Sequence, residues 1–171
     1  SDIQVVPAAV DPNGVPLAEP GINRVGGYAT PLDFDGNIKP ATIWDRTRYA
    51  NIWTGELGGG LLGYAQFPDN STLPGMPGGA GGAANTDGVV CTYTSIGSVA
   101  MPHPSGGQFN KGRTLTHEIG HWIGLRHLWG EDGAGGCNSD DYVNDTPNQS
   151  APNNGGCANN NSCTDVTTPL D

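Results

Sequence analysis

Basic residues are scarce in this chain. Only 7 of its 171 residues are Lys or Arg, against 17 Asp and Glu, and the net charge is −10. A surface that binds nucleic acid needs clustered Lys and Arg to neutralise phosphates, so this class of partner is excluded. An acidic surface instead suits cations, calcium among them, and keeps a secreted protein soluble.

Long apolar runs are also missing. No stretch of about 18 apolar residues occurs, so no membrane partner is expected. The first residues carry no charged and apolar leader, and we expect a mature or processed chain. The 28 Gly and 14 Pro predict a loop-rich fold with short strands and few helices. With 35% hydrophobic residues, the chain can still form a packed core.

The four cysteines form no CxxC pair. Their wide spacing argues against a structural zinc cluster and favours disulfides, hence an extracytoplasmic location. Cys137, Cys157 and Cys163 lie in a Gly- and Asn-rich tail, where a bridge would add stability. Cys91 lies alone in an apolar strand pattern, and a buried thiol is the simpler interpretation there.

Patterns of apolar residues predict four strands and one helix. The helix covers "KGRTLTHEIGHWIGL" and ends near Gly124, because glycine readily takes the positive φ that closes a helix. A Gly- and Pro-rich loop over 69–87 is long enough to be functional or mobile. The predicted strands are 3–8, 48–57, 61–67 and 88–98, and the apolar helix face is Leu115, Ile119, Trp122 and Ile123.

Three of the four histidines lie within eleven residues, in the pattern H-E-x-x-H-x-x-G-x-x-H. His117 and His121 are four apart, so a helix presents both on one face, where their nitrogens can reach one ion. Gly124 lets the chain turn and return His127 as a third ligand. Three imidazoles with an open fourth position are typical of catalytic zinc. Histidines brought together by chance on a helix surface are the alternative.

Glu118 follows the first histidine and is the candidate catalytic residue. At this position a carboxylate can act as general base on a zinc-activated water. The chain offers no competing Ser/His/Asp or Cys/His arrangement. The remaining histidine, His103, lies between prolines in "MPHPSGG", and we expect it to be an exposed loop residue.

The long zinc motif resembles that of the metzincin metallopeptidases. Further blocks narrow the resemblance to the pappalysin family: "IKPATIWDRTRYANIW", "LGGGLLGYAQFP", "DGVVCTYTSIGS", "GRTLTHEIGHWIGLRHLWG" and "DDYVNDTP". The resemblance implies a secreted, calcium-dependent zinc endopeptidase of the α+β class. The implied fold is a twisted mixed five-stranded sheet with a zinc-binding active-site helix, followed by an irregular segment stabilised by calcium and a disulfide.

The same resemblance assigns further residues. It makes "GVVCTY" a rim strand that pairs with extended substrate by β-augmentation, the residues being Gly88, Val89, Val90, Cys91, Thr92 and Tyr93. An ordinary edge strand is the alternative. Calcium would be held by Asp141, the carbonyl of Val143, Asp145 and Thr146, whose alternative is a solvated acidic loop. The family pattern pairs Cys137 with Cys163 and pairs Cys157 with a later cysteine, which this chain lacks.

By this resemblance, residues 1–171 belong to a catalytic domain, with an N-terminal subdomain over about 1–124. Residues from about 125 to 171 form the beginning of a C-terminal subdomain, and we expect the family's methionine turn to lie beyond residue 171. The expected partners are a peptide or protein substrate and a C-terminal companion fragment. Two other functions stay open: a non-catalytic zinc- and calcium-binding fragment that retains only peptide-strand binding, and a zinc hydrolase acting on non-peptide substrates.

Overall fold

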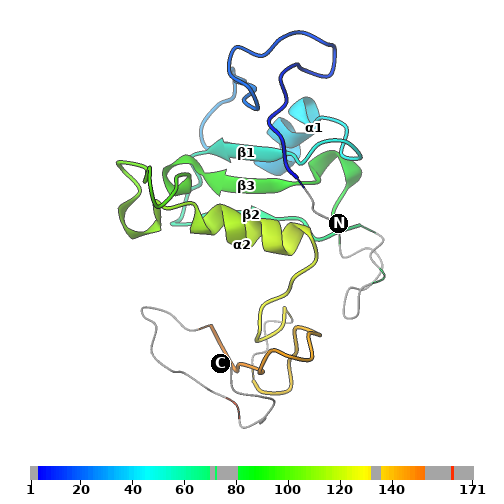
Figure 1. Cartoon of the computed structure of the whole chain (residues 1–171), viewed down its shortest axis with the longest axis vertical. Coiled ribbons are helices and arrows are strands. Elements are labelled where there is room, and N and C mark those ends of the chain that lie inside the picture. Colours follow the sequence, from blue (N-terminus) through cyan, green and yellow to red (C-terminus); the bar gives the residue numbers. More distant parts are fainter. Residues whose placement is uncertain (1–3, 70–71, 73–80, 132–135, 153–162, 164–171) are drawn as a thin grey trace. The chain divides into compact units, whose positions relative to one another are not determined.

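The computed structural model describes residues 4–69, 72, 81–131, 136–152 and 163 (Figure 1). The backbone forms two compact units. Unit 1 comprises residues 1–64 and 83–115, and unit 2 comprises residues 65–82 and 116–171. Within the described ranges, no helix is both long enough and apolar enough to cross a membrane.

Unit 1 begins its regular structure with a helical turn. A π-helical segment, η1 (Phe34–Ile38), runs directly into α1 (Lys39–Thr42). The carboxylate of Asp33 caps the start by accepting a hydrogen bond from the Gly36 amide at 2.9 Å. Phe34 and Ile38 are buried, so this short segment is held by its contribution to the core rather than by its length.

The sheet has three strands in the described chain: β1 (Ile52–Gly55), β2 (Gly63–Ala65) and β3 (Val89–Thr92). Their order is β1-β3-β2, and β1 and β3 are parallel, with Ile52 opposite Val89 (Figure 1). All four residues of β3 are buried, as expected for a central strand. The prediction of five strands is therefore not matched by the described residues.

The core of unit 1 lies between the helical turn and the sheet. Its buried members are Phe34, Ile38, Trp53 and Val90, and partly buried apolar residues pack around them. Trp53 also donates a hydrogen bond from Nε1 to the Thr42 hydroxyl at 2.9 Å. This bond satisfies the indole N–H inside an apolar cluster. At the start of β3, Gly88 has φ +141°, and a Cβ there would collide with the carbonyl oxygen of Asn51.

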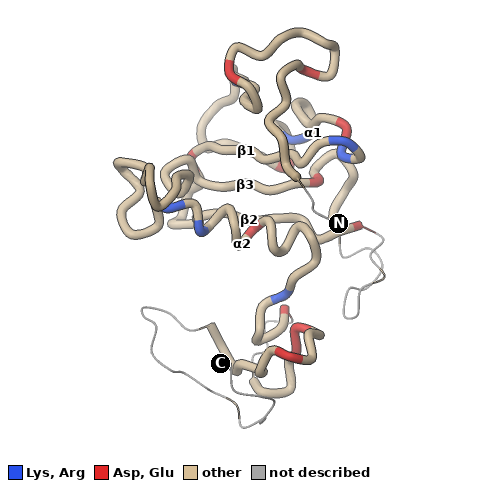
Figure 2. Tube along the Cα trace, in the orientation of Figure 1, with Lys and Arg blue, Asp and Glu red and all other residues tan. Residues whose placement is uncertain are grey.

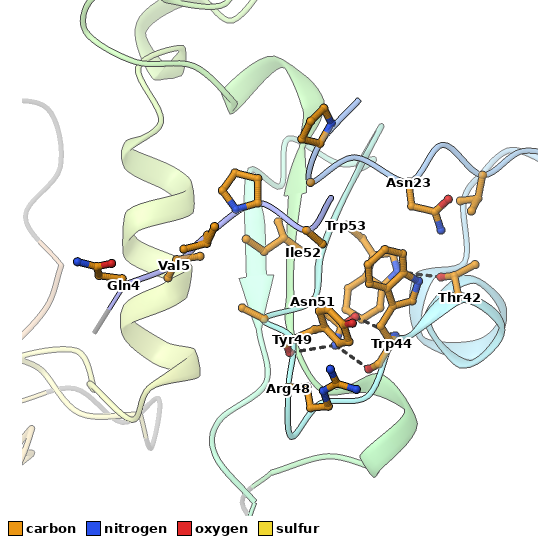
Figure 3. A pocket seen from close by; sticks show the side chains of 17 residues that line it. Gln4, Val5, Asn23, Thr42, Trp44, Arg48, Tyr49, Asn51, Ile52 and Trp53 are labelled. Atoms are coloured by element: carbon orange, nitrogen blue, oxygen red, sulfur yellow. Dashed lines mark hydrogen bonds between the residues drawn. The ribbon is translucent and has the colours of Figure 1, made fainter. Parts of the chain in front are cut away.

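The predicted first strand is wrong over its described residues, 4–8, which form no strand. Val5 and Val6 are 80% and 74% exposed. The Ala8 carbonyl accepts instead from the Gly21 amide at 2.7 Å, which ties this segment to its own loop. The stretch is apolar and bounded by turn residues, as a strand often is, but no strand of the described chain pairs with its described residues. The segment borders a hollow of about 530 Å³ beside β1, lined in part by Val5, Trp44 and Ile52 (Figure 3).

Two polar side chains of this hollow, Asn51 and Thr42, are engaged in hydrogen bonds within the protein. The Asn51 side chain donates to the Trp44 carbonyl at 3.0 Å and accepts from the Trp44 amide at 2.9 Å (Figure 3). The Thr42 hydroxyl donates to the Ile38 carbonyl at 2.6 Å. These hydrogen bonds stabilise the segments beside β1. We therefore propose no ligand for the hollow.

The rim-strand assignment is corrected by the sheet order. Residues 89–92 form the middle strand, bonded to β1 on one side and facing β2 on the other. The Thr92 amide, for example, donates to the Leu62 carbonyl at 2.8 Å. Tyr93 already belongs to a 3₁₀ turn, Tyr93–Ser95. A substrate strand cannot add to β3, because both of its edges are taken.

The predicted helix is confirmed as α2 (Arg113–Trp122). It ends in a Schellman motif: the Leu125 amide donates to the Gly120 carbonyl at 2.8 Å, and the Gly124 amide to the His121 carbonyl at 2.9 Å. Gly124 has φ 104°, the conformation that its glycine predicted. Ile123 lies beyond the helix and is 57% exposed, so it does not extend the apolar face.

Candidate metal centre

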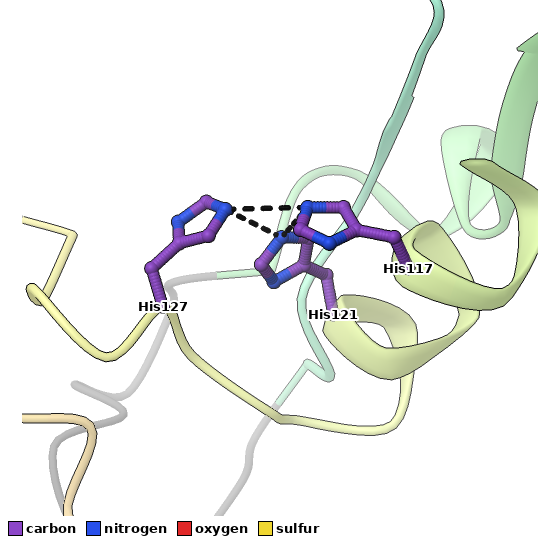
Figure 4. Close-up of side chains that lie close together, drawn as sticks. All are labelled: His117, His121 and His127. Atoms are coloured by element: carbon purple, nitrogen blue, oxygen red, sulfur yellow. Dashed lines mark hydrogen bonds between the residues drawn. The ribbon is translucent and has the colours of Figure 1, made fainter. Parts of the chain in front are cut away.

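Helix α2 and the turn after it bring three imidazoles together. The ring centroids of His117 and His121, one helical turn apart, are separated by 4.6 Å. His127 follows the glycine turn, and its ring centroid lies 4.4 Å from that of His121. Figure 4 shows the three rings pointing toward one another. The local spacing of the motif is thus sufficient to assemble the cluster.

The three Nε2 atoms form a nearly regular triangle. His121 Nε2 lies 3.1 Å from Nε2 of both His117 and His127, and the third side measures 3.3 Å. Ligands placed tetrahedrally about 2.0–2.1 Å from zinc are separated by about 3.3–3.4 Å. The triangle therefore has nearly the dimensions of one face of a zinc tetrahedron, and a fourth corner remains for water or substrate.

The opposite ring nitrogens explain why the Nε2 lone pairs converge. Nδ1 of His121 lies 2.8 Å from the Leu125 carbonyl oxygen, and Nδ1 of His127 lies 2.8 Å from Glu131 Oε1. Both partners are acceptors, so each Nδ1 is the donor, which leaves Nε2 as the ring atom that can ligate an ion. Lone pairs about 3 Å apart repel unless a cation lies between them, so these residues fit a metal ion.

Electrostatics favours the neutral form of His117. Burial lowers the pKa of this imidazole, and the neighbouring His121 and His127 lower it further. Glu131 acts in the opposite direction, more weakly. A neutral imidazole is the form that ligates a metal.

Glu118 is the buried residue of α2, with an exposed fraction of 8%. Burial raises the pKa of its carboxyl, and the charge of His121 partly offsets this effect. A desolvated carboxylate is a stronger base than one in water, which suits proton transfer. Glu118 follows His117 directly within α2, so the two residues lie on the same helical turn.

Aromatic rings support two of the histidines. Trp129 stacks on His127 with a centroid distance of 4.4 Å and an interplanar angle of 13°. Phe67 meets His121 edge to face at 5.4 Å. The sequence interpretation did not identify these neighbours or Glu131. Trp129 and Glu131 could have been found from their positions two and four residues after the third histidine.

The expected calcium ligands are partly brought together. Asp141 is buried, and its Oδ2 accepts from the Thr146 hydroxyl at 2.7 Å. That hydroxyl also lies 2.9 Å from the Val143 carbonyl oxygen. Three of the four expected oxygen sources thus lie within one turn, in a short acidic stretch of unit 2 (Figure 2). No contact places Asp145 with them in the described structure.

The predicted disulfide is confirmed. Cys137 and Cys163 are bonded, with their Cα atoms 5.5 Å apart. Cys91 is a buried thiol within β3, as its apolar surroundings indicated. Cys157 lies outside the described residues.

In the loop before α2, His103 is partly buried and meets the Tyr93 ring edge to face at 5.7 Å. The expectation of an exposed His103 is therefore wrong in this detail.

Three converging imidazoles beside a buried carboxylate define the class of metallopeptidases with a helical zinc motif. Residues 34–168 match the peptidase M43 family, described as Pregnancy-associated plasma protein-A. The chain belongs to this family, that of the pappalysins, which confirms the resemblance seen in the sequence.

Named relatives agree with this assignment. An extracellular metalloprotease of Pyricularia oryzae is 39% identical over 156 residues, which cover 89% of this chain and 49% of the relative. An extracellular metalloprotease of Coccidioides posadasii is 40% identical over 106 residues, covering 61% of this chain and 33% of the relative. The chain thus spans about half or less of the length of these relatives.

The fold is also similar to a solved structure. Mature mirolysin of Tannerella forsythia, in complex with a cleaved peptide, matches with a TM-score of 0.62 and 38% identity. The match covers 85% of this chain and 51% of mirolysin. The chain therefore has a mixed α+β, metzincin-like fold.

Proposed function

We propose that this chain is a secreted, zinc-dependent endopeptidase, or the zinc-binding part of one, that hydrolyses internal peptide bonds. The observation that carries the proposal is the Nε2 triangle of His117, His121 and His127, with sides of 3.1, 3.1 and 3.3 Å. Membership of a metallopeptidase family supports the reaction class. The disulfide and the extracellular relatives support secretion.

The mechanism assigns one task to each group. Bound zinc supplies a Lewis acid that lowers the pKa of water toward about 7 and polarises a carbonyl. His117, His121 and His127 hold the ion through neutral Nε2 atoms. Glu118 accepts the proton of the attacking water and passes it to the leaving amine. Its burial, which raises the pKa of the carboxyl, helps it to carry that proton between the two.

The corrected sheet order moves the proposed substrate edge from β3 to β2. β2 is an outer strand of the described sheet, whereas the hollow beside the other outer strand, β1, is bordered by residues 4–8. An extended peptide would add main-chain hydrogen bonds along the outer side of β2. Peptides N-methylated at alternate backbone amides test this assignment, because loss of pairing should raise KM. An unchanged KM for every methylated position would exclude β-augmentation.

Residues 1–124 and 125–171 are proposed as the N-terminal subdomain and the beginning of the C-terminal subdomain of the catalytic domain. Structural calcium is proposed at Asp141, Val143 and Thr146, with Asp145 as a further ligand. The contacts of the first three support this site. Thermal unfolding with and without calcium tests it, and identical curves would exclude a structural role.

A second function is favoured by one observation: the chain covers only 51% of mirolysin. In that alternative, the chain binds zinc and a peptide strand but turns nothing over without a C-terminal companion segment. Digestion of a peptide library by the purified, zinc-loaded chain separates these functions. Internal cleavage that stops on chelation and returns with zinc supports the endopeptidase. Zinc binding with no cleavage supports the alternative, and hydrolysis of non-peptide amides alone would indicate a different zinc hydrolase.

A further inference from the structure

His127 is the histidine that α2 does not hold. His117 and His121 lie inside the helix, whose backbone fixes where their side chains begin. His127 follows the Gly124 turn on irregular backbone, and its carbonyl accepts from the Gly130 amide at 2.8 Å in the next turn. A ligand on such backbone must be oriented by its own contacts, because an imidazole can rotate about two side-chain bonds.

One carboxylate oxygen fixes both ends of His127. Glu131 Oε1 accepts from the His127 backbone amide at 2.7 Å and from its Nδ1 at 2.8 Å. The two side chains are 24% and 25% exposed, so most of this contact is shielded from water. Bonds from one oxygen to the main chain and the ring of the same residue restrict the ring to one rotamer, with Nε2 turned toward the triangle.

The turn between these two residues adds a second restraint. Trp129 covers the face of the His127 ring nearly in parallel, at an angle of 13°. Gly130 has φ +75°, and a Cβ there would lie 2.8 Å from Cβ of Ser139. The turn is therefore restricted to glycine at that position, and it delivers Trp129 and Glu131 to the same imidazole.

His121 is supported differently. Its Nδ1 contacts the carbonyl oxygen of Leu125, a main-chain group that no substitution removes. Among the contacts of the described chain, Glu131 is the side-chain carboxylate held against a histidine of the triangle. A carboxylate in this position fixes the orientation of its imidazole and selects the Nδ1–H tautomer.

We propose that Glu131 is a positioning residue of the zinc site, which holds His127 in the ligating orientation and tautomer through paired hydrogen bonds to its amide and Nδ1. This rests on the proposed function, because it takes the three histidines to bind zinc. Loss of such outer partners typically weakens metal binding about 10–100-fold.

The test measures zinc affinity of the full chain by competition with a coloured chelator. Glu131→Ala, which removes both hydrogen bonds, should weaken zinc binding about 100-fold. Glu131→Gln, which keeps one acceptor oxygen but loses the charge, should weaken it about 10-fold. The matched control is Glu56→Ala, which removes an exposed carboxylate from unit 1 and should leave zinc affinity unchanged.

A spectroscopic measurement separates positioning from simple structural support. Cobalt(II) in the site has visible absorption bands that report ligand geometry, and both Glu131 variants should alter them at saturating metal. The metal-free variants should unfold at the same urea concentration as the metal-free parent chain. If Glu131→Ala does not fold, the zinc affinity and cobalt spectrum of Glu131→Gln test the proposal in its place.

The outcomes are distinct. Wild-type affinity and an unchanged cobalt spectrum in a folded Glu131 variant would overturn the role of Glu131 while leaving the zinc site intact. An equal loss in Glu56→Ala would also overturn it, because the effect would then be one of net charge. If the parent chain itself binds no zinc, both this inference and the proposed function fail.

Discussion

The ammonium group of Lys39 is buried in unit 1, and its Nζ lies 2.7 Å from Oδ1 of Asp35, one helical turn earlier. Lys39 is 1% exposed at its side chain, whereas Asp35 is 57% exposed. The other carboxylate oxygen of Asp35 accepts from the Tyr64 hydroxyl at 3.0 Å, and Nζ lies 4.6 Å from the centre of the Tyr64 ring. This cluster joins the helical turn to strand β2.

Substitutions of Lys39 should show whether its buried methylene groups or its charge contributes more to the free energy of unfolding. Lys39→Ala removes buried methylenes and leaves a cavity, so the free energy of unfolding should fall by about 2–4 kcal/mol. Lys39→Met keeps the volume, and Asp35 can be solvated, so the loss should be about 1 kcal/mol or less. Urea denaturation of both variants measures the difference. Equal losses would show that the ion pair, and not the packing, carries the effect.

Stability at high pH should depend on Tyr64. Burial and the hydrogen bond to Asp35 raise the pKa of this phenol well above its usual range. The folded chain therefore retains a proton that the unfolded chain loses above about pH 10, so the free energy of unfolding falls as pH rises. The fall approaches about 1.4 kcal/mol per pH unit for this group. Tyr64→Phe should show a shallower decline between pH 9 and 11 than Tyr93→Phe, and equal slopes would contradict the assignment.

Calcium should stabilise the chain through Asp141. At a calcium concentration about 100 times its dissociation constant, the gain in unfolding free energy should be about 2.7 kcal/mol. Asp141→Asn should abolish this gain, because Asp141 supplies the buried carboxylate among the proposed calcium ligands. The neighbouring Asp140 is exposed and provides the matched variant. A calcium response that survives in Asp141→Asn and disappears in Asp140→Asn would place the ion elsewhere.

The Cys137–Cys163 bridge should stabilise the segment after α2. Its cysteines are 26 residues apart in sequence, and closing a loop of this length restricts the unfolded chain by about 3.5 kcal/mol at 25 °C. Cys137→Ser should lower the unfolding free energy by roughly that amount under oxidising conditions. Under reducing conditions, parent and variant should converge. A difference that persists after reduction would indicate a packing role for the sulfur instead.

The candidate zinc ligands could be predicted from sequence because their geometry is local. A four-residue helical spacing and one glycine turn suffice to place His117, His121 and His127, and Gly124 has the positive φ that this turn requires. The fold class and the disulfide followed from the family resemblance, whose motifs extend beyond the helix. Helical spacing and family motifs were therefore sufficient to predict the three candidate ligands.

The incorrect sequence predictions concern how segments far apart in the chain pair with one another. Alternation of apolar residues identified 88–98 as a strand but could not show that β1 and β2 would lie on either side of it. Apolar residues bounded by turn residues over 3–8 also suggested a strand, yet the Ala8 carbonyl accepts from the Gly21 amide of its own loop. Glu131 was missed although it lies only four residues after His127, because its proposed role depends on the turn that returns its carboxylate to that histidine.

Digestion of an internally quenched peptide by the zinc-loaded chain, beside Glu118→Ala at equal zinc content, tests the central claim most directly. We predict one zinc per chain in both proteins, and internal cleavage that falls at least about 10²–10⁴-fold in the variant, because the proton acceptor is gone. Chelation should abolish the parent's activity, and added zinc should restore it. Cleavage that persists in Glu118→Ala or after zinc removal would contradict this account, as would a zinc-loaded parent chain that cleaves nothing.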